Sequence, residues 1–132
     1  MHTIPIRVYY EDTDFSGAVY HANYLRFLER GRTEMVRSAG IAQADLHAAT
    51  GLGFMVRRMT IEFLRPARMD DLVTVTTQVR EVRGASMLLH QEIRRGEDLL
   101  LLTAEVVVAA VKGGRGTRIP DALRRALQMG DR

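Results

Sequence analysis

The sequence predicts a single α+β domain in which one long helix packs across an antiparallel sheet of about five strands. Two observations carry this prediction. The hydrophobic period changes from two to that of a helix over residues 23–38, and then returns to two for most of the remaining chain. The chain has 132 residues, the length of one domain, and its 46% hydrophobic and 27% charged side chains are typical of a globular protein.

The first 40 residues predict a strand, a polar loop and the long helix. Residues 4–10 alternate apolar and polar side chains, with β-branched and aromatic residues, and therefore predict a strand. Residues 11–20 hold three acids, a serine and a glycine and follow neither period, which indicates a loop. In the helix over residues 23–38, Gly31 costs about 1 kcal/mol relative to alanine, so we expect a neighbouring backbone to approach closely there. Gly40 follows the last turn and suits a helix C-terminus.

The remaining chain is read mainly as strands. A short helical turn over residues 41–52 is followed by four strands in hairpins, over residues 54–64, 72–82, 87–94 and 99–111. The last strand is the most apolar and predicts burial on both faces. A glycine-rich exit leads to a short basic helix that Pro120 opens and that runs to about residue 129. One helix cannot cover both faces and the edges of such a sheet, so we expect a partner chain to cover an apolar edge.

The composition excludes several classes of protein. The chain has no cysteine, which rules out disulfide scaffolds, thiolate catalysis, zinc held by cysteine and iron–sulfur clusters. Residues 112–132 carry a net charge of +4 and residues 1–111 one of −1, and only 6% of the side chains are aromatic, so a nucleic-acid-binding surface is not expected. Neither a signal peptide nor an apolar run of about 20 residues is visible, which predicts a soluble, cytoplasmic protein that does not span a membrane.

The residues that suggest chemistry lie in one window, 9–24, which ends at the start of the long helix. Glu11, Asp12 and Asp14 crowd into four positions just before this helix. The helix N-terminus offers free backbone N–H donors and a partial positive charge, which together polarise a carbonyl oxygen placed there. A nearby carboxylate is then able to attack that carbonyl or to take a proton from a water that does so. The window therefore indicates acyl transfer without serine or cysteine.

Two other interpretations of the same window stay open on the residues alone. The acids also fit a solvated turn with helix-capping side chains. A metal site built from Asp12, Asp14 and His21 is the second alternative, although this spacing matches no tight ligand template. The other histidines, at positions 2, 47 and 90, lie in no comparable cluster and receive no role.

The window also resembles the signature of a known family, the hot-dog-fold acyl-CoA thioesterases of the hydroxybenzoyl-CoA thioesterase type, and especially their YbgC-like, Tol-Pal-associated branch. The resemblance covers nearly the whole chain, including strand order and length. The matching residues are Tyr10-Glu11-Asp12-Thr13-Asp14, Gly17, Val19-Tyr20-His21-Ala22-Asn23-Tyr24, Glu29-Arg30, Arg32-Thr33-Glu34, Phe63-Leu64-Arg65-Pro66-Ala67-Arg68 and Asp70-Asp71.

The resemblance implies a long helix wrapped by a curved antiparallel sheet, with two chains joined into one continuous sheet, often within tetramers. It implies that Asp14, the second acid of the Asp-x-Asp pair, is the catalytic carboxylate. It places His21 at the helix start, where the backbone N–H polarises the thioester carbonyl. The implied substrate-binding residues are Gly17, Tyr20, Asn23 and Tyr24.

Two departures from the family pattern are visible. Phe15 and Ser16 replace small residues after Asp14, which puts the acyl-chain preference in doubt, and Gly31 stands where alanine is common.

A thioesterase for coenzyme A also needs cations for the phosphates of its substrate, and arginine suits phosphate through paired N–H donors. The candidates are Arg57, Arg58, Arg65, Arg83 and the arginines of the C-terminal tail, up to Arg132. The phosphate end of the substrate is also able to cross to a partner subunit, so the sequence does not choose among these residues.

The resulting hypothesis is a cytoplasmic acyl-CoA thioesterase, a homodimer or homotetramer that needs no metal or redox cofactor. A hot-dog hydratase or dehydratase acting on acyl thioesters is the rival within enzymes. The rival from another class is a non-enzymatic, acyl-thioester-binding adaptor of the Tol-Pal cell-envelope system, and contacts with cell-envelope or lipid-synthesis proteins follow from the same resemblance. Release of free CoA thiol separates hydrolysis from both rivals.

Overall fold

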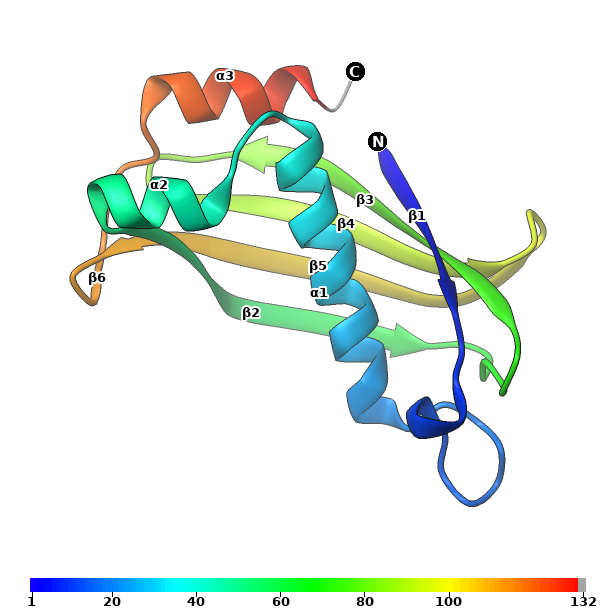
Figure 1. Cartoon of the computed structure of the whole chain (residues 1–132). Helices are drawn as coiled ribbons and strands as arrows, with labels where there is room; N and C mark the ends of the chain where they lie inside the picture. The colour runs from blue at the N-terminus through cyan, green and yellow to red at the C-terminus, as the bar shows by residue number, and fades with distance from the viewer. Residues whose placement is uncertain (131–132) are drawn as a thin grey trace.

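The computed structural model describes residues 1–130 and shows one curved antiparallel sheet wrapped around a long helix (Figure 1). The sheet order is β1-β3-β4-β5-β2, and a short sixth strand, β6, pairs with β5. The strands are β1 (His2–Arg7), β2 (Leu52–Phe63), β3 (Leu72–Val82), β4 (Ser86–Arg95), β5 (Leu99–Lys112) and β6 (Arg115–Gly116). The helices are α1 (His21–Ser38), α2 (Gln43–Thr50), α3 (Asp121–Met129) and the single 3-10 turn η1 (Tyr10–Asp12). The predicted α+β class is thereby confirmed.

The core lies between α1 and the concave face of the sheet. The buried face of α1 is Asn23, Tyr24, Phe27, Leu28, Gly31, Met35 and Val36. It packs on inward-facing strand residues such as Val75, Leu89, Ile93 and Val106, none of which is measurably exposed. The alternation of buried and exposed residues along β3 and β4 follows the period of two that predicted these strands.

Gly31 lies where α1 packs tightly against the sheet, but the reason differs from the expected one. A Cβ atom at this position would stand 2.6 Å from Val75 Cγ1, 3.0 Å from Thr77 Oγ1 and 3.1 Å from Gln91 Nε2. The close neighbours are therefore side chains of β3 and β4 rather than a backbone.

Most element boundaries agree with the predictions, with one topological difference. α1 begins at His21, two residues before the predicted start, and β1 ends at Arg7 because the 3-10 turn η1 follows. β3, β4 and β5 form the predicted hairpins, whereas β2 pairs with β5 and not with β3, its neighbour in the chain. The expectation that all four late strands form sequential hairpins is therefore wrong for β2.

β1 and β2 are the two outer strands along the path of the sheet. β2 is the more exposed, since Met55, Val56 and Phe63 are each at least 40% accessible in the single chain. An apolar edge of this kind is the surface that the sequence analysis assigns to a partner chain. Within residues 1–130, no helix is long and apolar enough to cross a membrane.

Candidate active site

The loop that carries the acids folds as a small hairpin before α1. Thr13 and Val19 form an isolated antiparallel bridge, and the N–H of Gly17 donates to the carbonyl of Asp14 at 3.1 Å, which closes a four-residue turn. Gly17 has φ +82°, a left-handed conformation that glycine adopts without strain. The N–H of Met69 donates to the carbonyl of Gly17 at 3.1 Å and ties the turn to the segment before β3. The turn is thus anchored at its base while its tip projects into solvent.

Asp14 begins this turn, and among residues 1–130 its carboxylate is hydrogen bonded to Ser16 alone. The backbone N–H of Ser16 donates to Asp14 Oδ1 at 2.8 Å, and the Ser16 hydroxyl donates to the same oxygen at 2.5 Å. The Ser16 hydroxyl, the Ser16 N–H and the charge of His21 together lower the pKa of Asp14 below its ordinary value of 3.8. The carboxylate is therefore ionised at neutral pH.

Asp12, the first acid of the pair, has a structural position. Its carboxylate is buried and accepts hydrogen bonds from the N–H of Tyr9 at 2.8 Å and from the Asn23 side chain at 2.9 Å. Its carbonyl accepts the N–H of Tyr20 at 3.0 Å. Asp12 therefore fixes the loop to the first turn of α1, and both of its carboxylate oxygens are engaged in these structural hydrogen bonds.

The N-terminus of α1 is open. Tyr20 is the N-cap residue, and neither its side chain nor an acidic residue of the first turn caps the helix. The N–H of Asn23 donates back to the carbonyl of Tyr20 at 2.8 Å, which leaves the N–H groups at the very start of the helix, beginning with His21, for another acceptor. An uncapped helix end of this kind favours a group that carries or develops negative charge.

Asp14 and His21 line the same cavity, which has a volume of about 240 Å³. Its wall includes Tyr24 from α1 and Phe63 from the end of β2, whose rings lie 5.7 Å apart at 55°. The His21 ring lies 4.8 Å from that of Phe63. The remaining lining residues are Ala18, Val19, Leu64, Arg65 and Pro66. One small cavity therefore combines a carboxylate, a helix N-terminus, an aromatic wall and one cation.

Tyr24 is held in this wall by its hydroxyl. Tyr24 is 3% exposed, and its oxygen accepts the N–H of Ala67 at 2.9 Å. Burial raises the pKa of Tyr24, so the phenol stays neutral and its ring serves as a fixed surface. Sequence analysis did not single out Phe63 as a site residue, because its position at the end of a strand gives no local sign of contact with residues some 40 positions earlier.

Several predicted site residues lie outside this cavity. Gly17 shapes the turn, Tyr20 is 56% exposed, and the side chain of Asn23 is engaged by Asp12. Among the candidate phosphate ligands, Arg65 lines the cavity, while Arg57 and Arg58 are exposed on β2 at its bulge.

Arg83 is remote from the cavity within one chain. It follows the far end of β3, about 30 Å of strand from the Asp14 loop, and pairs with Glu81 at 3.2 Å. Arg132 lies outside the described residues. A second cavity, of about 380 Å³, opens between α1 and β2 and is lined by none of the predicted site residues.

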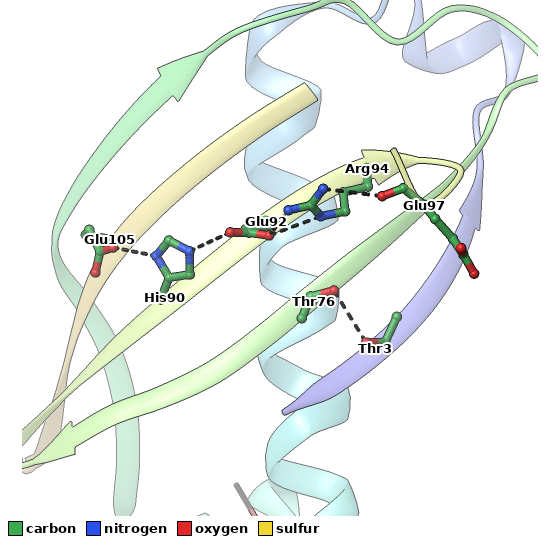
Figure 2. Close-up of polar contacts among 7 residues, drawn as sticks. All are labelled: Thr3, Thr76, His90, Glu92, Arg94, Glu97 and Glu105. Carbon is green, nitrogen blue, oxygen red and sulfur yellow. Dashed lines mark hydrogen bonds and ion pairs between the residues drawn. The ribbon is translucent and has the colours of Figure 1, made fainter. Parts of the chain in front are cut away.

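One polar cluster was missed by sequence analysis. On the outer face of the sheet, both ring nitrogens of His90 meet carboxylates, with Nδ1 at 2.5 Å from Glu105 and Nε2 at 3.0 Å from Glu92 (Figure 2). Arg94 donates to the other oxygen of Glu92 at 2.8 Å. The spacing of His90 and Glu92 by two residues on a strand signals a shared face, but the pairing of His90 with Glu105 depends on strand register. Among residues 1–130, no group of three acidic or histidine side chains is arranged to hold a metal ion.

The sequence and the fold of this chain both resemble those of known thioesterases. The Thioesterase superfamily profile matches residues 16–102. The chain is 48% identical over 107 residues to the acyl-CoA thioester hydrolase YbgC of Escherichia coli O6:H1. The aligned segment covers 81% of this chain and 79% of that protein. It is 45% identical over 113 residues to the acyl-CoA thioesterase YbgC of Haemophilus influenzae, with 86% and 82% covered.

A probable thioesterase from Bartonella henselae, known from a crystal structure, superposes with a TM-score of 0.86 at 42% identity and covers 90% of this chain and 98% of that one. The predicted hot-dog fold is thereby confirmed, as is the predicted family. The chain belongs to the thioesterase superfamily, as a member of its YbgC-like branch of hot-dog-fold acyl-CoA thioesterases.

Proposed function

We propose that this thioesterase hydrolyses an acyl-CoA thioester to CoA and a free carboxylic acid, with Asp14 as the catalytic carboxylate. The observation that carries the proposal is that Asp14 and the open N-terminus of α1 line one cavity. A thioester carbonyl bound there accepts a hydrogen bond from the His21 backbone N–H, and the helix terminus stabilises the negative charge that develops on its oxygen.

Two mechanisms of hydrolysis are compatible with this arrangement. In the first, Asp14 attacks the carbonyl carbon, the carbon–sulfur bond breaks, CoA leaves as the thiolate, and water hydrolyses the resulting anhydride. In the second, Asp14 takes a proton from a water as its oxygen attacks the carbonyl carbon. The carbon–sulfur bond then breaks, the carboxylic acid forms, and the CoA sulfur leaves with the proton that Asp14 had taken. Both need an ionised carboxylate, which the hydrogen bonds from Ser16 favour. Both are consistent with a side chain that is accessible from the cavity.

The decisive experiment is Asp14→Asn, assayed by release of CoA thiol from a panel of acyl-CoAs. The substitution keeps the size of the side chain but removes its charge, and the loss of such a group lowers the rate by about 10²–10⁴-fold. Glu11→Gln is the matched control, since Glu11 is an exposed acid of the same segment that does not line the cavity. If Asp14→Asn keeps more than about a tenth of the turnover, Asp14 is not the catalytic residue.

The contribution of His21 is assigned to its backbone. His21→Ala therefore lowers the rate less than Asp14→Asn does, because the N–H at the helix start is retained. An equal loss, together with a new pH dependence near neutrality, would show instead that the imidazole takes part in the reaction.

Arg65 is the proposed first contact for the CoA phosphates, because among Arg57, Arg58, Arg65 and Arg83 it is the one that lines the cavity. Arg57, Arg58 and Arg83 remain proposed ligands for phosphates that reach a second subunit. A residue that binds phosphate contributes to substrate binding and not to the chemical step, so Arg65→Ala is expected to raise KM while kcat changes little. A fall in kcat at unchanged KM would contradict this assignment.

We propose that the working unit is at least a homodimer, with a tetramer formed if two dimers pack together. The support is the apolar edge strand β2, which ends at Phe63 in the cavity wall, so that a chain docked on β2 also borders the active site. Light scattering at micromolar concentration tests this assembly. A stable and active monomer of 14.9 kDa would contradict both the dimer and the shared site.

A cytoplasmic location fits an acyl-CoA substrate and belongs to the same proposal. Association with cell-envelope or lipid-synthesis proteins stays a prediction.

A further inference from the structure

Ser16 is unusual in giving both of its hydrogen-bond donors to one oxygen of Asp14. Its backbone N–H lies 2.8 Å and its hydroxyl 2.5 Å from Asp14 Oδ1. None of the described residues donates a hydrogen bond to Oδ2. We propose that Ser16 is a positioning residue, which clamps Oδ1 so that Oδ2 is the oxygen presented to the thioester or to the attacking water. The inference rests on the catalytic role of Asp14 proposed above.

The direction of the serine hydroxyl is itself constrained. A hydroxyl has one proton to donate and two lone pairs that accept. The N–H of Ala18 points to Ser16 Oγ at 3.4 Å and occupies an acceptor site, so the single proton is left for Asp14. The base of the turn fixes the backbone of this segment, through the bonds from Gly17 to Asp14 and from Met69 to Gly17. The clamp is therefore built on an anchored turn.

Such a clamp matters because Asp14 has no other means of fixing its orientation. Asp14 is exposed at the start of a turn, and rotation of a carboxyl group about its last torsion has two broad, roughly equivalent minima. Without Ser16, the two oxygens exchange places and the side chain samples other rotamers. A reacting group that leaves its productive geometry loses rate even when its chemistry is unchanged. The same two bonds favour the ionised form and account for most of the lowered pKa of Asp14.

Ser16→Ala removes the hydroxyl and keeps the backbone donor. We expect kcat to fall by about tenfold at pH 7.5 with KM little changed, because one of the two bonds that position Oδ1 is lost while substrate binding is not affected. The pKa of Asp14, followed by NMR of its ¹³C-labelled carboxyl carbon, moves up toward the ordinary value of 3.8. Ser16→Thr retains a hydroxyl on Cβ and restores both kcat and the carboxyl titration.

Thr13→Ala is the matched control. Thr13 also carries a loop hydroxyl, one residue before Asp14, but that hydroxyl donates to the carbonyl of Tyr10 at 2.8 Å. Thr13→Ala should therefore leave the Asp14 titration unchanged. Thermal unfolding of each variant shows whether the fold is retained.

Three outcomes would overturn the inference. Wild-type kcat and titration in Ser16→Ala overturn it, as does an equal shift in Thr13→Ala, since the effect then belongs to the loop as a whole. If Ser16 acts through Asp14, Ser16→Ala causes no further loss in the Asp14→Asn background, whereas a second tenfold loss there contradicts the clamp. High activity in Asp14→Asn alone overturns the proposed function instead, so the two failures are distinguishable.

Discussion

Gln91 joins three parts of the fold, and replacing it with leucine tests how the helix is held on the sheet. Gln91 lies on the inward face of β4 and has no exposed surface. Its Nε2 donates to the carbonyl of Leu28 at 2.9 Å and to Thr77 Oγ1 at 2.9 Å. Its Oε1 accepts from Arg32 Nη1 at 3.0 Å. These contacts surround the place where Gly31 brings α1 against the sheet.

The expected cost follows from these contacts. Two neutral hydrogen bonds contribute about 1 kcal/mol each, and a bond to a charged group contributes about 1.5–3 kcal/mol. Arg32 borders the 380 Å³ cavity and can be rehydrated there, while the leucine side chain gains about 1 kcal/mol from its additional apolar burial. The net loss for Gln91→Leu is therefore about 2–4 kcal/mol of unfolding free energy. For a chain of this length, that corresponds to a fall in Tm of about 7–14 °C.

Thermal and urea unfolding at fixed protein concentration measure this loss, since a dimer's stability depends on concentration. Thr77→Val sharpens the test. Thr77 has no exposed surface, so Gln91→Leu leaves its hydroxyl buried without this donor, and adding Thr77→Val to Gln91→Leu should cost nothing or restore stability. A loss below about 1 kcal/mol for Gln91→Leu, or strictly additive effects of the two substitutions, would refute the reasoning.

Two further predictions concern stability. Burial favours the neutral His90 ring, but its bonds to Glu92 and Glu105 outweigh this and raise the pKa of His90, while its bond lowers the pKa of Glu92. The stabilisation that His90 contributes to the fold is therefore complete below its unfolded pKa of 6.5 and is lost as the pH rises through its folded pKa. The stabilisation from Glu92 is complete above its unfolded pKa of 4.5 and is lost as the pH falls through its folded pKa. The Tm of the wild-type protein should exceed that of the His90→Gln variant by the largest amount between pH 4.5 and 6.5. A difference in Tm that does not depend on pH would contradict the pairing of His90 with the two glutamates. The second prediction is that Gly31→Ala lowers Tm, because it gains about 1 kcal/mol of helix propensity but loses about 1–3 kcal/mol to crowding with Val75. Adding Val75→Ala to the same chain should recover part of that loss. A rise in Tm for Gly31→Ala alone would argue against the tight contact.

The sequence indicated a candidate site where the residues with suitable chemistry lie in one continuous segment. The acids at 11–14 and the start of α1 at His21 lie within eleven residues, and a hydrophobic period that begins just after them indicates a helix terminus. The choice of Asp14 and His21 within this window came from the resemblance to the thioesterase family and not from the spacing. The roles of the two aspartates are separated only by folding, because Asp12 finds Asn23 and the Tyr9 N–H while Asp14 is left facing the cavity.

The sequence by itself determined the elements of this protein, because the periods of helix and strand and the conformations of glycine and proline are local properties. It determined the long helix, the late strands and the polar loop between β1 and α1. Only the tertiary structure decided that β2 pairs with β5, that Phe63 joins Tyr24 in the cavity wall, and that His90 meets Glu105. Each of these contacts joins residues brought together by sheet register and helix packing, and such contacts depend on how apolar faces are buried against each other rather than on neighbours in the chain.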